Sequence, residues 1–168
     1  MDSLERCKMG KLSSQRVAIL VDAQNIYLSA RARGAKPNYR KIMERINGRQ
    51  VVRAIVYIIQ SEGADVRSFI QALESMGYEV RSKKPRPLPD GTHKADWDMQ
   101  IAIDALSLAD KIDVMVILSG DSDFTPLVYA LKSKGVKTEI MSFRETTGRE
   151  LIEAANEYVQ LNDEVLFK

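Results

Sequence analysis

The segment with the clearest chemistry runs from residue 114 to residue 124. It begins with the apolar run Val-Met-Val-Ile-Leu and continues as Ser119-Gly120-Asp121-Ser122-Asp123-Phe124. A short run rich in β-branched residues, closed by a Ser/Gly/Asp turn, is typical of a fully buried parallel strand. In open α/β sheets, ligands bind outside the carboxyl ends of the strands. Two carboxylates at such a turn can converge on one divalent cation.

A second apolar run, residues 16–21, also ends in an acid, because Asp22 follows it and Asn25 comes three residues later. If the two strands are neighbours, their carboxyl ends lie at one edge of the sheet and bring their acids together. Like charges packed so closely repel one another, and a hard cation bound through oxygen is the usual remedy. We therefore expect Mg²⁺ or Mn²⁺ at this edge.

A third acidic segment is Asp96-Trp97-Asp98, at the start of an expected helix over residues 96–109. Asp96 and Asp98 are about 200° apart around a helix, so they cannot share one face. Either Asp96 is the N-cap and Asp98 points inward, or the reverse. The helix is mostly apolar, so Asp104 in its middle needs a partner.

A plainer interpretation competes with the metal site. Aspartate is a favoured N-cap residue, so Asp121 or Asp123 could serve only to bind the first free N–H groups of a helix. Whether other strands end in the same way decides between these interpretations. His93 is the only histidine in the chain, which argues against zinc hydrolysis and histidine-based nucleophilic catalysis. Gln24 stands where an aspartyl phosphatase needs its second acid, and no glycine-rich nucleotide loop is present.

Positive charge is concentrated in residues 81–94, although the net charge of the whole chain is only +2. Five basic residues stand there against one acid; they are Arg81, Lys83, Lys84, Arg86 and Lys94. Three prolines and Gly91 predict a loop. Such a cluster suits a phosphate backbone, so Lys83, Lys84, Arg86 and Lys94 are candidate residues for binding one. A solvated loop with no partner is the alternative.

The remaining pattern alternates strands with helices, which predicts an α/β fold with a mostly parallel sheet. The expected strands cover residues 16–21, 51–59, 78–82, 114–118, 136–143 and 158–161.

We expect residues 1–15 to be a flexible leader and residues 16–168 to form one domain. With no apolar run of 18 residues and no secretory signal, we expect a cytoplasmic protein without a membrane partner. Strand 51–59 or the edge at 78–82 could support a homodimer.

Three blocks of this chain resemble the motifs of the NYN domain family, in its LabA-like (DUF88) branch, which belongs with the PIN-like nucleases. They are Val21-Asp22-Ala23-Gln24-Asn25, Lys94-Ala95-Asp96-Trp97-Asp98 running into Asp104, and Ser119-Gly120-Asp121-Ser122-Asp123-Phe124. The resemblance covers about residues 16–161. It implies a three-layer, Rossmann-like PIN fold with helices on both faces of the sheet, and a metal-dependent ribonuclease activity.

The resemblance also implies roles for individual residues. Asp22, Asp98, Asp121 and Asp123 match the metal-site and catalytic acids, and Asp96 is an additional ligand candidate. Asn25 matches a residue that orients Asp22 or a water at the site, and Ser119 matches a small hydroxyl residue beside the substrate. The resulting hypothesis is an endoribonuclease that uses Mg²⁺ or Mn²⁺ and water on single-stranded or structured RNA. The alternative is a regulatory RNA- or protein-binding module that keeps the acidic site without cutting.

Overall fold

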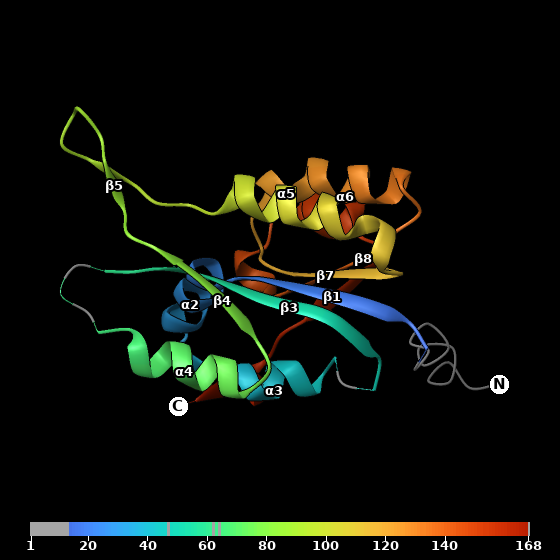
Figure 1. Ribbon diagram of the computed structural model, residues 1–168, viewed down its shortest axis with the longest axis horizontal. Helices are drawn as coiled ribbons and strands as arrows, with labels where there is room; N and C mark the ends of the chain where they lie inside the picture. The colour runs from blue at the N-terminus through green and yellow to red at the C-terminus, as the bar shows by residue number, and fades with distance from the viewer. Residues whose placement is uncertain (1–13, 47, 62, 64, 168) are drawn as a thin grey trace.

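A six-stranded sheet forms the centre of the computed structural model, which describes residues 14–46, 48–61, 63 and 65–167 (Figure 1). The strand order is β4-β3-β1-β7-β8-β9, and every neighbouring pair is parallel. The strands are β1 (Arg16–Asp22), β3 (Gln50–Ile59), β4 (Glu79–Lys83), β7 (Val114–Leu118), β8 (Lys137–Ser142) and β9 (Glu157–Gln160).

Helices cover both faces of this sheet, so the molecule has three layers (Figure 1). One face packs against α2 (Ala23–Ala32), α3 (Tyr39–Glu44) and α4 (Arg67–Ser75). The other face packs against α5 (Asp98–Leu108), α6 (Thr125–Ser133) and α7 (Arg149–Ala154). Four short 3₁₀ turns complete the helical elements of the described residues: η1 (Ala109–Lys111), η2 (Ser122–Phe124), η3 (Arg144–Thr146) and η4 (Asp163–Val165). The predicted α/β fold is confirmed.

The central strands are apolar because both of their faces are buried. In β1, Val17, Ile19 and Val21 point into one core, while Ala18 and Leu20 point into the other. All five residues of β7 are buried as well. Near-continuous apolar runs are what a parallel strand covered on two sides requires. The same runs provided the strand predictions over residues 16–21 and 114–118.

Strands β1 and β7 are neighbours, and the direction of winding reverses between them. From β1 the chain builds outward through β3 to β4, and it then crosses back to place β7 on the other side of β1. Val21 lies beside Leu118 in the register, so Asp22 and Ser119 leave the sheet side by side. Such a switch point is where open α/β sheets form their ligand crevice. The strand adjacency on which the metal-site prediction depends is present.

The basic segment differs from the predicted loop. After β4 the chain forms a two-stranded antiparallel hairpin from β5 (Arg86–Pro87) and β6 (His93–Lys94). Figure 1 shows this hairpin extending beyond the body of the molecule, past the start of α5. We call residues 84–95 the arm. Composition indicated its turn residues but not the pairing of its two sides.

The structure also bears on the remaining predictions. Strand β3 lies inside the sheet between β4 and β1, so of the two candidate homodimer segments only β4 offers a free edge. A short antiparallel pair of β2 (Lys36–Pro37) and β10 (Leu166–Phe167) was not foreseen. Residues 1–13 of the expected leader lie outside the described residues. No helix in the described ranges has the length and apolar character needed to cross a bilayer.

A buried ion pair spans the sheet from the residue before β3 to β8. The guanidinium of Arg49 donates to both carboxylate oxygens of Glu139 on β8, at 2.8 and 3.1 Å, and the two side chains are only 3% and 0% exposed. The bidentate geometry satisfies both charges where water cannot. Removing one partner of such a pair leaves the other charge buried and uncompensated.

We expect Glu139→Ala to lower the free energy of unfolding by about 3–5 kcal/mol, because Arg49 loses its counter-charge in a dry environment. Urea denaturation followed by circular dichroism measures this change. Glu79→Ala is the matched control, since Glu79 pairs with Arg53 at the surface, where such pairs contribute about 0–1 kcal/mol. Equal losses in the two variants would contradict the prediction.

Candidate metal centre

The ends of β1 and β7 are joined by the side chain of Ser119. Its hydroxyl donates to Oδ2 of Asp22 at 3.1 Å and accepts from the backbone N–H of Asp121 at 3.2 Å. Oδ1 of Asp22 accepts from the N–H of Asn25 at 3.3 Å, which caps α2. Both carboxylate oxygens of Asp22 are therefore oriented by hydrogen bonds from the protein.

Asn25 supports the turn after β7 rather than facing the other acids. Its Oδ1 accepts from the N–H of Gly120 at 2.9 Å. Gly120 itself has no room for a side chain, because a Cβ there would lie 2.6 Å from the carbonyl oxygen of Thr146. Only glycine at this bend therefore lets the Thr146 backbone lie so close to the turn. This bend delivers Asp121 to the edge where Asp22 already lies.

The turn continues into η2, where Asp121 has two roles. Its Oδ1 accepts from the N–H of Asp123 at 2.9 Å, so Asp121 is an N-cap as the plainer interpretation proposed. A capping bond occupies one oxygen and leaves the other available. Capping and membership of an acidic cluster are therefore compatible in this residue.

Helix α5 brings the third acid. Both alternatives for its start were wrong about the cap, because the N-cap residue is Trp97 and the helix begins at Asp98. Asp98 is the inward acid, whereas Asp96 is exposed and its Oδ1 accepts from the Asp98 N–H at 3.2 Å. The Trp97 indole N–H donates to the carbonyl of Ile58 at 3.0 Å, and its ring lies 5.4 Å from that of Tyr57. Trp97 thus packs in the core, as predicted, and anchors the beginning of α5.

These elements place Asp98, Asp121 and Asp123 together, with one carboxylate oxygen from each within 4.8 Å of the others. Asp22 and Asp96 lie outside this set of three, although both are close enough to interact electrostatically with Asp98. In the part of the chain that the structure describes, no lysine or arginine forms an ion pair with any of the five. We call these five residues the acidic cluster.

The pKa values of two members are shifted by this environment. Burial raises the pKa of Asp98 to about 6, and the negative charges of Asp121, Asp22, Asp96 and Asp123 add to the effect. Burial is also the main cause that raises the pKa of Asp22, against the opposing hydrogen bonds from Asn25 and Ser119. Both shifts mean that the charged cluster is disfavoured without a counter-charge.

The donor set fits a hard divalent cation. Asp98, Asp121 and Asp123 supply only oxygen donors, from three different positions around one point. Mg²⁺ and Mn²⁺ prefer such ligands, whereas zinc is usually held by nitrogen or sulfur. Asp22, held by Asn25 and Ser119, adds its negative charge beside these three acids. The arrangement could hold one or more cations at the carboxyl edge of the sheet.

A buried network that the sequence did not reveal fixes α5 to the sheet. Asp104 is 8% exposed, and its carboxylate accepts from the Tyr57 hydroxyl at 2.6 Å and from Nε2 of Gln100 at 2.9 Å. Arg81 lies 3.5 Å away and adds a counter-charge. Burial, followed by the bond to Asp104, raises the pKa of Tyr57. The need of Asp104 for a partner was predicted; Tyr57, 47 residues away, was not.

The predicted RNA-binding residues lie on or beside the arm. Lys83 at its base is engaged, since its ammonium lies 4.2 Å from the centre of the Trp97 ring and donates to the carbonyl of Asp96. Lys84, Arg86 and Lys94 are exposed, and no ion pair involves them among the described residues. Lys94 is four residues before Asp98, so the arm joins directly to the acidic cluster.

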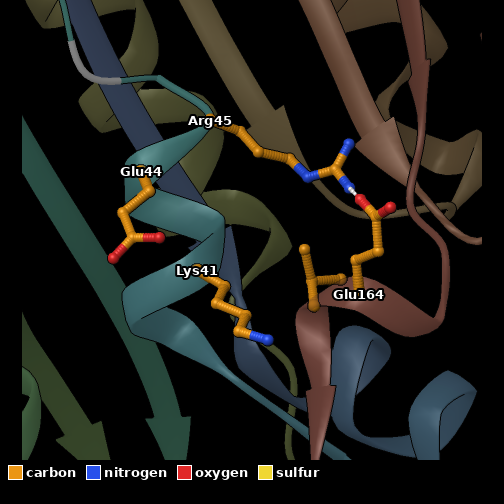
Figure 2. Close-up of a pocket in the computed structure, with 5 residues that line it drawn as sticks. Lys41, Glu44, Arg45 and Glu164 are labelled. Carbon is orange, nitrogen blue, oxygen red and sulfur yellow. Dashed lines mark hydrogen bonds and ion pairs between the residues drawn. The ribbon is translucent and has the colours of Figure 1, made fainter.

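A separate surface pocket of about 460 Å³ lies between α3 and the η4 segment. Figure 2 shows Lys41 and Glu44 on α3 and Arg45 at its end, with Arg45 reaching across to Glu164. Their guanidinium and carboxylate are 2.9 Å apart. Charges of both signs alternate around this pocket and none of the predicted site residues lines it. We assign the chemistry to the acidic cluster instead.

Comparisons with known proteins agree with this architecture. The model of the NYN domain family matches residues 16–162. The low amplitude and bright protein LabA of Synechococcus elongatus is 29% identical in an alignment of 157 residues, and the match covers 88% of this chain and 84% of that protein. The crystal structure of a protein of unknown function from Vibrio parahaemolyticus is 32% identical, with a TM-score of 0.86 over 92% of this chain and 98% of its own.

We expect Asp98→Asn to raise the Tm of the protein in EDTA at pH 7.5 by about 2–4 °C. The charged carboxylate is disfavoured in the folded state, and solvent screening of this partly exposed group reduces the penalty to about 1 kcal/mol. Because the folded-state pKa is raised to about 6, the penalty is absent near pH 4 and grows as the pH rises to 6. Differential scanning calorimetry across this range measures it.

Mn²⁺ provides the complementary measurement. It should raise the Tm of the wild type at pH 7.5 and have less effect on Asp98→Asn, which lacks one ligand. Asp110→Asn, at an exposed acid after α5, is the control and should behave like the wild type. A wild type that is more stable than Asp98→Asn in EDTA at pH 7.5 would contradict the analysis of the cluster.

Proposed function

Because this chain belongs to the NYN domain family, within the PIN-like nuclease superfamily, we propose that it is a metal-dependent endoribonuclease that hydrolyses phosphodiester bonds of RNA. The observation that carries the proposal is the acidic cluster, in which Asp98, Asp121 and Asp123 bring oxygens within 4.8 Å of one another at the switch point of the sheet. Mg²⁺ or Mn²⁺ is the cofactor that this donor set favours.

Each residue of the site has a role in this proposal. Asp98, Asp121 and Asp123 hold the cation, with Asp22 and Asp96 as further acids around it. Ser119 and Asn25 keep Asp22 and the Gly120 turn in place through their hydrogen bonds. When bound, a divalent cation offsets charge on the phosphate and makes a nearby water a better nucleophile. Residues fixed by hydrogen bonds require little reorganisation to receive it.

The arm supplies the affinity for the RNA backbone. Arg86 and Lys94 lie directly opposite each other in its antiparallel pair. Like charges in that arrangement are destabilising unless an anion lies between or beside them. A phosphate backbone provides such an anion, and the direct connection from Lys94 to Asp98 would guide the strand toward the acidic cluster.

A non-cleaving regulatory module that binds RNA or protein is the second candidate. Asp22 and Asp121 are N-cap residues, so both stabilise the fold whether or not the protein cuts RNA. This structural role favours the second candidate. The two candidates differ in whether RNA is cut, so one experiment separates them.

We expect the wild type to cut a pool of single-stranded and structured RNA with Mg²⁺ or Mn²⁺ but not with EDTA. Asp121→Asn should reduce the rate about a hundredfold or more, because it removes a ligand of the cation while the amide can still cap η2. Gel analysis of end-labelled RNA gives both the rate and the cleavage positions. Asp110→Asn is the matched control and should keep full activity.

Two outcomes would reject parts of this proposal. Full activity of Asp121→Asn would show that the acidic cluster is not the catalytic site. RNA binding without cutting under any of these metals, at an excess of protein, would instead favour the regulatory module.

Combined replacement of Lys84, Arg86 and Lys94 by alanine should lower the affinity for RNA. It should also make that affinity less sensitive to the salt concentration. Three phosphate contacts on a single strand contribute about 2 to the slope of log K against log salt concentration, so we expect the slope to become shallower by about that amount. Fluorescence anisotropy from 50 to 200 mM KCl measures it.

The control is replacement of three exposed lysines elsewhere, Lys41, Lys111 and Lys134, which changes the net charge equally. The prediction fails if the two triple variants lose the same slope, since binding would then reflect overall charge rather than the arm.

A further inference from the structure

A surface cavity of about 610 Å³ lies immediately beside the acidic cluster. It is bounded by the η2 turn, the first turns of α6 and the start of α7; its lining residues are Ser122, Asp123, Thr125, Pro126, Tyr129 and Glu150. Asp123 belongs both to this cavity and to the set of three close carboxylates. A molecule in the cavity therefore lies next to anything bound at the acidic cluster.

The cavity has an aromatic wall. Tyr129 is 58% exposed, although large aromatic side chains are usually mostly buried. Its only described ring or cation contact is with the ammonium of Lys132, 5.9 Å from the ring centre. An exposed aromatic ring is the platform on which unpaired bases stack, and such stacking is tolerant of sequence. The exposed Pro126 one turn earlier extends this apolar surface.

The polar groups of the cavity accept hydrogen bonds more than they donate them. Asp123 and Glu150 carry carboxylates, which in their charged form accept hydrogen bonds and donate none. No lysine or arginine is among the residues that line the cavity. Such a wall repels phosphate and favours a neutral group that carries N–H donors. The exocyclic amine of cytosine, adenine or guanine is such a donor, and carboxylates accept from the amine of cytosine in nucleic-acid complexes.

We propose that this cavity is a nucleobase subsite that takes an unpaired base with an exocyclic amine, stacked on Tyr129 and hydrogen-bonded to Glu150. The inference rests on the proposed RNA substrate and makes it more specific. A base can enter only when it is not stacked or paired within a duplex, so the preferred substrate is a single-stranded segment. The phosphate next to the captured base then lies beside Asp123.

The first test uses a uridine decamer with one 2-aminopurine near its centre, a fluorescent base that carries an exocyclic amine and loses fluorescence on stacking. It is mixed with the Asp121→Asn protein and Mg²⁺, so that binding is measured under conditions of little cutting. We expect quenching on binding. Added Tyr129→Ala should abolish the quenching and weaken affinity about tenfold, whereas Tyr129→Phe should preserve both. Phe167→Ala, at a similarly exposed ring on β10, is the control and should change neither.

The second test asks about the amine. In the same protein, a uridine decamer with one central cytidine should bind about tenfold more tightly than the all-uridine decamer, because cytosine has an amine where uracil has a carbonyl. Glu150→Gln should remove this difference, since an amide can accept from cytosine or donate to uracil. Arg149→Ala, at the exposed neighbour of Glu150, should retain it.

The outcomes separate this inference from the function on which it rests. Metal-dependent cleavage with equal affinity for the two decamers and no effect of Tyr129→Ala would overturn the subsite and leave the nuclease intact. Base preference without cleavage by the wild type would support the subsite in a binding module. Absence of RNA binding by any of these proteins would overturn both.

Discussion

Repulsion between carboxylates is the physical constraint on which this end of the molecule depends. Burial and neighbouring charges both raise the pKa of Asp98, so the fold holds together groups that would separate if they were free. Backbone geometry prevents that separation. Asp22 is fixed by Ser119 and Asn25, and Asp121 is fixed by the Ser119 hydroxyl and by its own capping bond. A rigid scaffold of this kind keeps the acids in place for a cation to occupy.

The scaffold is rigid because its charged and polar contacts are buried in well-paired networks. Asp104 with Tyr57 and Gln100 connects α5 to β3, and Arg49 with Glu139 connects the loop before β3 to β8. The first network lies on the face of the sheet that α5 covers, and the ion pair spans the sheet from the start of β3 to β8. Together they restrict how far β7 and α5 can move relative to β1, and therefore how far apart Asp22, Asp98 and Asp121 can lie.

Local patterns in the sequence were sufficient for the strands and for the acids at their ends. A strand that is buried on two faces appears in the sequence as a continuous apolar run, and the turn at residues 119–123 is visible from its residue types alone. Neither pattern depends on knowing which distant residues it contacts. Contacts between distant residues were not accessible in this way. Tyr57 resembles any apolar strand residue, Glu139 occupies a strand with no visible counter-charge, and Tyr129 resembles an ordinary helix surface residue until α7 is placed beside it. The pairing of β5 with β6 was missed because each strand has only two residues.

The prolines of the arm have a consequence for aggregation. The N–H of Leu88 donates inward to the carbonyl of Thr92 across the hairpin. Successive N–H groups of an extended strand point to alternate sides, so the nitrogen of Pro87 in β5 faces outward. Proline has no hydrogen to donate there, and Pro85 and Pro89 stand on either side of the strand. A projecting hairpin can otherwise present an open edge that another chain extends into a shared sheet. The β5 edge offers no outward N–H within the strand, which makes it a poor template for self-association.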